Sequence, residues 1–150
     1  MNYNDTVIRW SKIATFLFVA MVIAADVFGV VISQYVCYVW AEKIDAVSLA
    51  IVMAVLYLGT VFAYVILVSL FLLLNNMSKD KVFDRANTKL MGIMVGSLVA
   101  AAVVCVVGGF VWFGNWLLAA FALFMGLVVL SVRCCFAKAI TMKEEMDLTI

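Results

Sequence analysis

The feature that most constrains the fold is a run of 43 residues, Leu90 to Val132, that contains no charged side chain. A continuous helix of that length would be about 65 Å long, roughly twice the thickness of the hydrocarbon core of a bilayer. The run must therefore fold back on itself. Gly114-Asn115 is the natural turn, because glycine next to asparagine favours a reversal of the chain and aromatic residues flank the pair. Two membrane-spanning helices are predicted, at about 90–113 and 116–132.

Two more apolar segments of spanning length precede this run, at about 13–39 and 47–74. Each exceeds the roughly 20 apolar residues that cross a bilayer. Because 69% of the 150 residues are hydrophobic and only 13% are charged, the chain lacks the polar side chains that would cover a soluble domain. The predicted fold is all-α: one domain, an integral membrane four-helix bundle built from two transmembrane hairpins and surrounded by membrane lipid.

The basic residues are distributed very unevenly between the two sides of the predicted spans. Nine of the ten lie before the first span, in the connection 75–89 or in the tail 133–150, and only Lys43 lies on the other side. Positive residues near spans favour the cytoplasmic side. The N and C termini are therefore predicted to be cytoplasmic. A net charge of +1 gives no overall field suited to direct contact with nucleic acid.

Asp26 is the one charged residue inside a predicted span. An ionised carboxylate at the bilayer centre costs about 2.5–3.5 kcal/mol, and no Lys, Arg or His lies in any span to pair with it. Asp26 is therefore expected to be protonated or to face a polar cavity. Two interpretations remain open: a proton- or cation-sensitive ligand site, or a hydrogen bond that joins two helices. The candidate members of this site are Asp26, Ser33, Tyr57, Thr60 and Tyr64, with Ser97 as a further hydrogen-bonding candidate.

Small residues recur at four-residue spacing in three places. The stripes are Ala25-Gly29-Ser33, Gly92-Gly96-Ala100 and Ala122-Gly126. Such stripes let helix backbones approach closely in lipid, either within the bundle or between copies in a homo-oligomer.

The residues offer no support for catalysis. Histidine is absent, the four cysteines are dispersed, and no span holds paired carboxylates or a nucleophile beside a base. We therefore expect no metal, no cofactor and no enzymatic activity.

The segments outside the spans carry most of the charge. Asp84 suits a helix N-cap, so the third helix is expected to begin near Arg85, and the fourth to continue out of the membrane to near Asp147. These stretches are either solvated helix ends or a docking surface for a cytosolic protein. The candidate residues of such a surface are Lys79, Lys81, Phe83, Asp84, Arg85, Glu144, Glu145 and Asp147.

Two short motifs carry a resemblance to a known family. The first is Lys81-Val82-Phe83 with Asn87 four residues after the phenylalanine, and the second is the tail Lys143-Glu144-Glu145 followed by Asp147-Leu148-Thr149-Ile150. They resemble the KVF…N loop and the ENDLTI tail of the four-helix membrane proteins grouped as domain-of-unknown-function family 2975, although Met146 stands where the family tail has asparagine.

The resemblance implies a bacterial inner-membrane protein, often encoded beside a small helix-turn-helix DNA-binding protein. The leading hypothesis is therefore a membrane-embedded sensor or regulator that acts with a cytosolic helix-turn-helix transcription factor. The alternative is a small transporter or channel subunit with its proton- or cation-sensitive site at Asp26.

Overall fold

The computed structural model describes residues 3–40, 45–79 and 82–148. Within these residues the chain forms helices and no strand. The helices are α1 (Tyr3–Val27), α2 (Gly29–Trp40), α3 (Ala46–Met77), α4 (Arg85–Gly108) and α5 (Gly114–Leu148). All except α2 are long and apolar enough to cross a membrane. The predicted all-α membrane class is confirmed.

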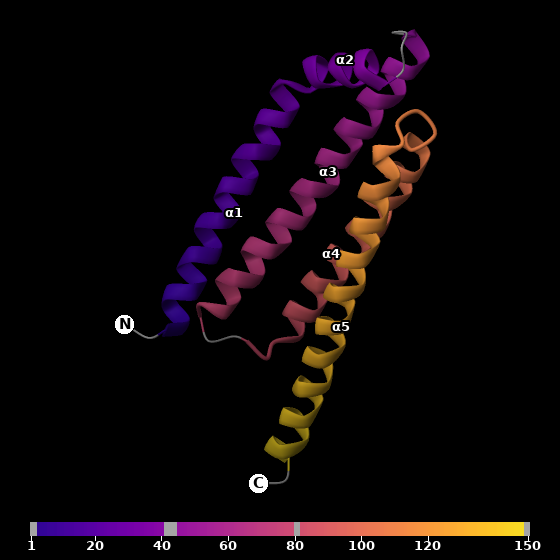
Figure 1. The fold of residues 1–150 in the computed structure, drawn as a ribbon. Helices are drawn as coiled ribbons and strands as arrows, with labels where there is room; N and C mark the ends of the chain where they lie inside the picture. Colours follow the sequence, from indigo (N-terminus) through magenta and orange to yellow (C-terminus); the bar gives the residue numbers. More distant parts are fainter. Residues whose placement is uncertain (1–2, 41–44, 80–81, 149–150) are drawn as a thin grey trace.

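The two ends of the molecule differ in composition. The N-terminus, the α3–α4 connection and the C-terminus lie at one end, and the α4–α5 turn lies at the other (Figure 1). We call the first end the basic end, because it carries Arg9, Lys12, Lys79, Arg85, Lys89, Arg133, Lys138 and Lys143.

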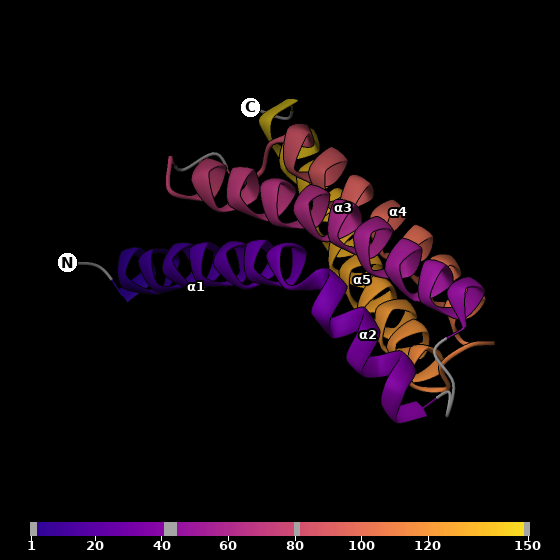
Figure 2. The ribbon, with the colours of Figure 1, turned by 90° about the horizontal axis from the view of Figure 1, so that it is seen from above.

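The single helix predicted over 13–39 is wrong, because α1 ends at Val27 and α2 begins at Gly29. Figure 2 shows α2 turned away from the axis of α1. A Cβ atom at Gly29 would lie only 2.9 Å from the hydroxyl oxygen of Tyr57. The absence of a side chain at Gly29 therefore allows the chain at the break to pack closely against α3. Tyr57 also donates a long hydrogen bond, 3.5 Å, to the carbonyl oxygen of Asp26, which a continuous helix would use in its own ladder. The break thus arises from close packing at a glycine, although the chain has no proline.

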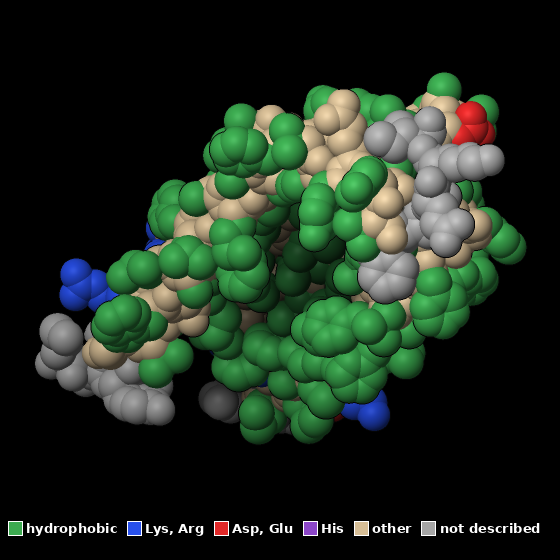
Figure 3. Space-filling model, turned by 45° about the horizontal axis from the view of Figure 1, so that its top comes forward, with side chains coloured by type: hydrophobic (Ala, Val, Ile, Leu, Met, Phe, Trp, Pro, Cys, Tyr) green, Lys and Arg blue, Asp and Glu red, His purple; other side chains and the backbone are tan. Residues whose placement is uncertain are grey.

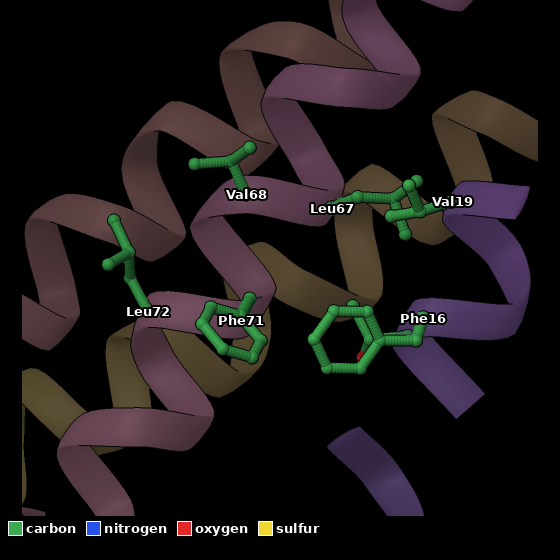
Figure 4. A pocket seen from close by; sticks show the side chains of 7 residues that line it. Phe16, Val19, Leu67, Val68, Phe71 and Leu72 are labelled. Atoms are coloured by element: carbon green, nitrogen blue, oxygen red, sulfur yellow. The ribbon is translucent and has the colours of Figure 1, made fainter. Parts of the chain in front are cut away.

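The helices pack as an open series. α1 and α2 pack against α3 and against each other, α3 packs against α4, and α4 packs against α5. Figure 2 shows α1 standing to one side of the other helices. Phe16 and Phe71 form an edge-to-face ring pair across the α1–α3 seam, with centroids 5.5 Å apart, beside an apolar cavity of about 160 Å³ (Figure 4).

The α4–α5 hairpin is the most closely packed part of the molecule. Ala102 on α4 and Ala119 on α5 are almost fully buried. A Cβ atom at Gly126 would lie 3.7 Å from the Cβ of Leu98, so the Ala122-Gly126 stripe serves packing within the chain. Gly96, in contrast, has no neighbouring atom within 4 Å of its Cβ position.

Both predicted helix ends at the basic end are confirmed. Asp84 caps α4, because its Oδ1 accepts a hydrogen bond of 2.9 Å from the backbone N–H of Ala86. The fourth predicted helix continues as α5 to Leu148.

Candidate functional site

Asp26 lies in the last turn of α1, beside the middle of α3. Its Oδ2 accepts a hydrogen bond of 2.8 Å from the hydroxyl of Tyr64. Its Oδ1 is buried and has no hydrogen-bond partner among the described residues. Tyr57, two turns before Tyr64 on α3, donates to the backbone carbonyl of the same aspartate. Two tyrosines of α3 therefore hold the end of α1 at the break.

The other predicted members of this site do not reach the carboxylate. Ser33 is fully buried on α2, and its hydroxyl has no partner within the described ranges. Thr60 donates to the carbonyl oxygen of Tyr57 on its own helix, at 2.9 Å. Ser97 lies on α4, which does not pack against α1. Asp26 and Ser33 lie on different helices, because the break at Phe28 separates α1 from α2.

The arrangement at Asp26 provides hydrogen-bond chemistry that depends on protonation. The hydroxyl of Tyr64 can donate to either form of the carboxyl group, but only the neutral form has a proton of its own to donate. When Asp26 is ionised, its unpaired Oδ1 can accept a hydrogen bond or bind a cation. When Oδ1 carries the proton, it can donate a hydrogen bond to an acceptor. No three His, Cys, Asp or Glu side chains come together in the described part of the chain.

A cavity near this site was not predicted. It has a volume of about 270 Å³, and its walls include Val36 on α2, Thr60 on α3, Cys105 on α4, Trp112 in the α4–α5 turn and Leu118 on α5. Figure 3 shows the molecule hollowed between its helices, with hydrophobic walls. The cavity depends on the direction that α2 takes after the break, so no local pattern in the sequence signals it.

A second constellation lies at the basic end, around Asn87. This side chain is fully buried: its Oδ1 accepts from the amide of Asn76 and its Nδ2 donates to the carbonyl of Val82, both at 2.9 Å. Lys12 on α1 donates to the hydroxyl of Ser78 at 3.1 Å. These bonds connect α1, the end of α3, the following loop and the start of α4.

Several predicted partner-binding residues contact one another. Arg85 donates two hydrogen bonds to Glu144, of 3.0 and 2.7 Å, and the ammonium of Lys143 lies 5.6 Å from the centre of the Phe83 ring. The end of α5 is thus attached to the start of α4. Lys79 and Glu145 are exposed, Lys81 lies outside the described residues, and the side chain of Asp147 also lies outside the described part.

We expect the Arg85–Glu144 pair to make the attachment of α5 dependent on pH. The hydrogen bond from Arg85, and then its charge, lower the pKa of Glu144, and the same contacts raise the pKa of Arg85. A carboxyl group whose pKa is lower in the folded protein stabilises the folded state at pH values above the ordinary glutamate pKa of about 4.3. That contribution is lost as the pH falls through the folded-state pKa.

We expect amide-exchange protection at the end of α5 to stay constant from pH 7 to pH 5 and to decrease when the pH is below about 4.3. Glu144→Gln should lower this protection at neutral pH and remove its pH dependence, as measured by mass spectrometry. An unchanged profile in this variant would contradict the assignment.

Four long apolar helices define the class of this chain as a multi-pass membrane protein. Residues 5–150 match the family model described as "Protein of unknown function (DUF2975)", so the chain belongs to that family. No curated protein and no solved structure matched the chain.

Proposed function

We propose that this protein is a membrane-embedded sensor and regulator that responds at Asp26 and relays the response to a cytosolic protein at the basic end. The observation that carries the proposal is the part-buried carboxyl of Asp26 at the break between two helices. Tyr64 donates to one of its oxygens, and the other oxygen is buried without a partner among the described residues. A change in protonation or the arrival of a cation changes which hydrogen bonds this carboxyl requires. A helix break next to such a group is a suitable hinge.

A physical connection from Asp26 to the basic end supports this role. α1 packs only against α2 and α3 among the described helices, so it can shift without disturbing the α4–α5 hairpin. Its first half carries Lys12, which donates to Ser78 where α3 ends. A displacement of α1 at Asp26 would therefore alter the loop that leads to Phe83 and Arg85. The family resemblance favours a small helix-turn-helix protein as the partner, and the basic end is then the cytoplasmic one.

The response is tested by amide exchange in lipid nanodiscs at several pH values. After correction for the intrinsic rate, we expect exchange in residues 82–89 to change between about pH 5 and pH 8 in the parent chain and to stay constant over that range in Asp26→Asn. The Arg85–Glu144 pair does not affect this comparison, because its contribution is expected to change only below about pH 4.3. Asp45→Asn is the matched control, because Asp45 is exposed at the start of α3 and makes no side-chain capping bond. The same pH dependence in Asp26→Asn and in the parent chain would rule out the role of Asp26.

The relay is tested separately by co-purification from native cells. A tagged full chain is expected to retain a small helix-turn-helix protein, and a chain that ends at Lys143 is expected to lose it. If deletion of residues 144–150 leaves the bound proteins unchanged, the relay hypothesis fails. Proton or cation flux into liposomes that depends on Asp26 would instead support the transporter alternative, which the absence of a second charged residue in the predicted spans disfavours.

A further inference from the structure

A hollow of about 340 Å³ lies between the start of α4 and the last third of α5, at the basic end. Its lining residues are Arg85, Thr88, Lys89, Ala137, Ile140 and Thr141. The Asp26 site lies on other helices, and Arg85 is the residue that this hollow shares with the proposed relay.

Arg133 on α5 lies beside the hollow and contacts one of its lining residues, Thr88. The Nε of Arg133 donates to the carbonyl oxygen of Thr88 at 3.1 Å. Its guanidinium carbon would lie 3.3 Å from a Cβ atom at Gly92, so the side chain rests on α4 where the helix has no side chain. Among the described residues, no hydrogen-bond partner is found for its two terminal nitrogens. The side chain of Arg133 is therefore held in place by its Nε, and its two terminal nitrogens remain available to donate hydrogen bonds.

The remaining donors around the hollow are cationic. The hydroxyls of Thr88 and Thr141 already donate to carbonyl oxygens of their own helices, at 2.8 and 3.1 Å. Arg85 is paired with Glu144, which neutralises one positive charge at the far side of the hollow. Lys89 and Arg133 supply the excess positive charge.

We infer that this hollow binds the phosphate of an anionic phospholipid headgroup, with Lys89 and Arg133 as the binding cations. Basic pockets between membrane helices on the positively charged side are suited to such headgroups. The position of the hollow favours a lipid over free phosphate, because Lys89 and Arg133 immediately flank the uncharged run 90–132. A phosphate bound there lies at headgroup depth, with its acyl chains beside the apolar surfaces of α4 and α5.

The test is a lipid titration of the purified full chain in neutral detergent, followed by native mass spectrometry. The probes are phosphatidylglycerol, phosphatidylcholine and inorganic phosphate. We expect preferential binding of phosphatidylglycerol, and an affinity about tenfold lower in the double variant Lys89→Gln/Arg133→Gln. The matched control is Arg9→Gln/Lys79→Gln, which removes the same charge from exposed residues at the same end but outside the hollow. Thermal unfolding checks that both variants are folded.

The outcomes separate the site from the general charge of the basic end. A loss of phosphatidylglycerol binding in the hollow variant, with the control like the parent chain, supports the proposal. Equal losses in both variants, or equal affinity for phosphatidylglycerol and phosphatidylcholine, would overturn it. Binding of inorganic phosphate at the same site without phosphatidylglycerol binding would overturn the assignment of a lipid.

Discussion

Gly108→Ala is expected to lower the free energy of unfolding by about 1–3 kcal/mol, the usual cost of overfilling a packed interior. A Cβ atom at this position would lie 2.5 Å from the amide nitrogen of Asn115 and 2.7 Å from a methyl carbon of Val55. Asn115 is 4% exposed and valine is stiff, so neither side chain can move away without a further rearrangement. The loss is measured by titrating the purified chain in mixed micelles with a denaturing detergent and monitoring unfolding by circular dichroism.

Gly96→Ala is the matched control on the same helix. No atom lies within 4 Å of the Cβ position at Gly96, so an added methyl group meets open space. The better helix propensity of alanine should leave stability unchanged or raise it by up to about 1 kcal/mol. Equal effects of the two substitutions would mean that Gly108 is not a packing position.

Asn87→Ala should be the most damaging substitution at the basic end. It would leave the amide of Asn76 and the carbonyl of Val82 without the partners that Asn87 gives them at 2.9 Å. A buried polar group left unpaired costs about 1–3 kcal/mol. Each of these two described groups is part-buried, so each is expected to contribute toward the lower end of that range. We expect lower thermal stability together with faster amide exchange in residues 82–89, both measured in nanodiscs.

Asn75→Ala provides the comparison for Asn87. Asn75 is the same residue type at the end of α3, and its side chain makes no hydrogen bond in the described part of the chain. Its replacement should change stability by less than about 0.5 kcal/mol. A loss of similar size in both variants would point to a general sensitivity of the loop instead of the bonds made by Asn87.

Local composition is sufficient to predict α3, α4 and α5 as long apolar helices, whereas the first predicted span, 13–39, is interrupted at Phe28. The uncharged run 90–132, with Gly114-Asn115 inside it, determines the α4–α5 hairpin. Asp84 predicts the start of α4 by the same kind of local chemistry, since a capping side chain bonds within its own turn. Tyr64 was one of several candidate partners of Asp26, because helical spacing shows which residues share a face but not which helices meet.

The features that could not be predicted all depend on contacts between helices. The stripe at Gly29 predicts a close approach of another helix, but it does not show that Tyr57 of α3 makes this approach or that α1 ends there. The pairing of Arg85 with Glu144 likewise joins residues 59 positions apart. The sequence predicts both as candidates for a partner-binding surface; in the structure they remain exposed and also pair with each other, which attaches α5 to α4.

The open series of helices also has a consequence for biosynthesis. Every pair of helices whose backbones pack together is adjacent or next but one along the chain, from α1·α2 and α1·α3 through to α4·α5. A nascent chain can therefore complete the contacts of α1 and α2 as soon as α3 has been inserted. α1 and α2 can therefore pack before α5 has been inserted, so assembly can proceed during translation. Helix surfaces that could misassemble are then exposed to lipid only briefly.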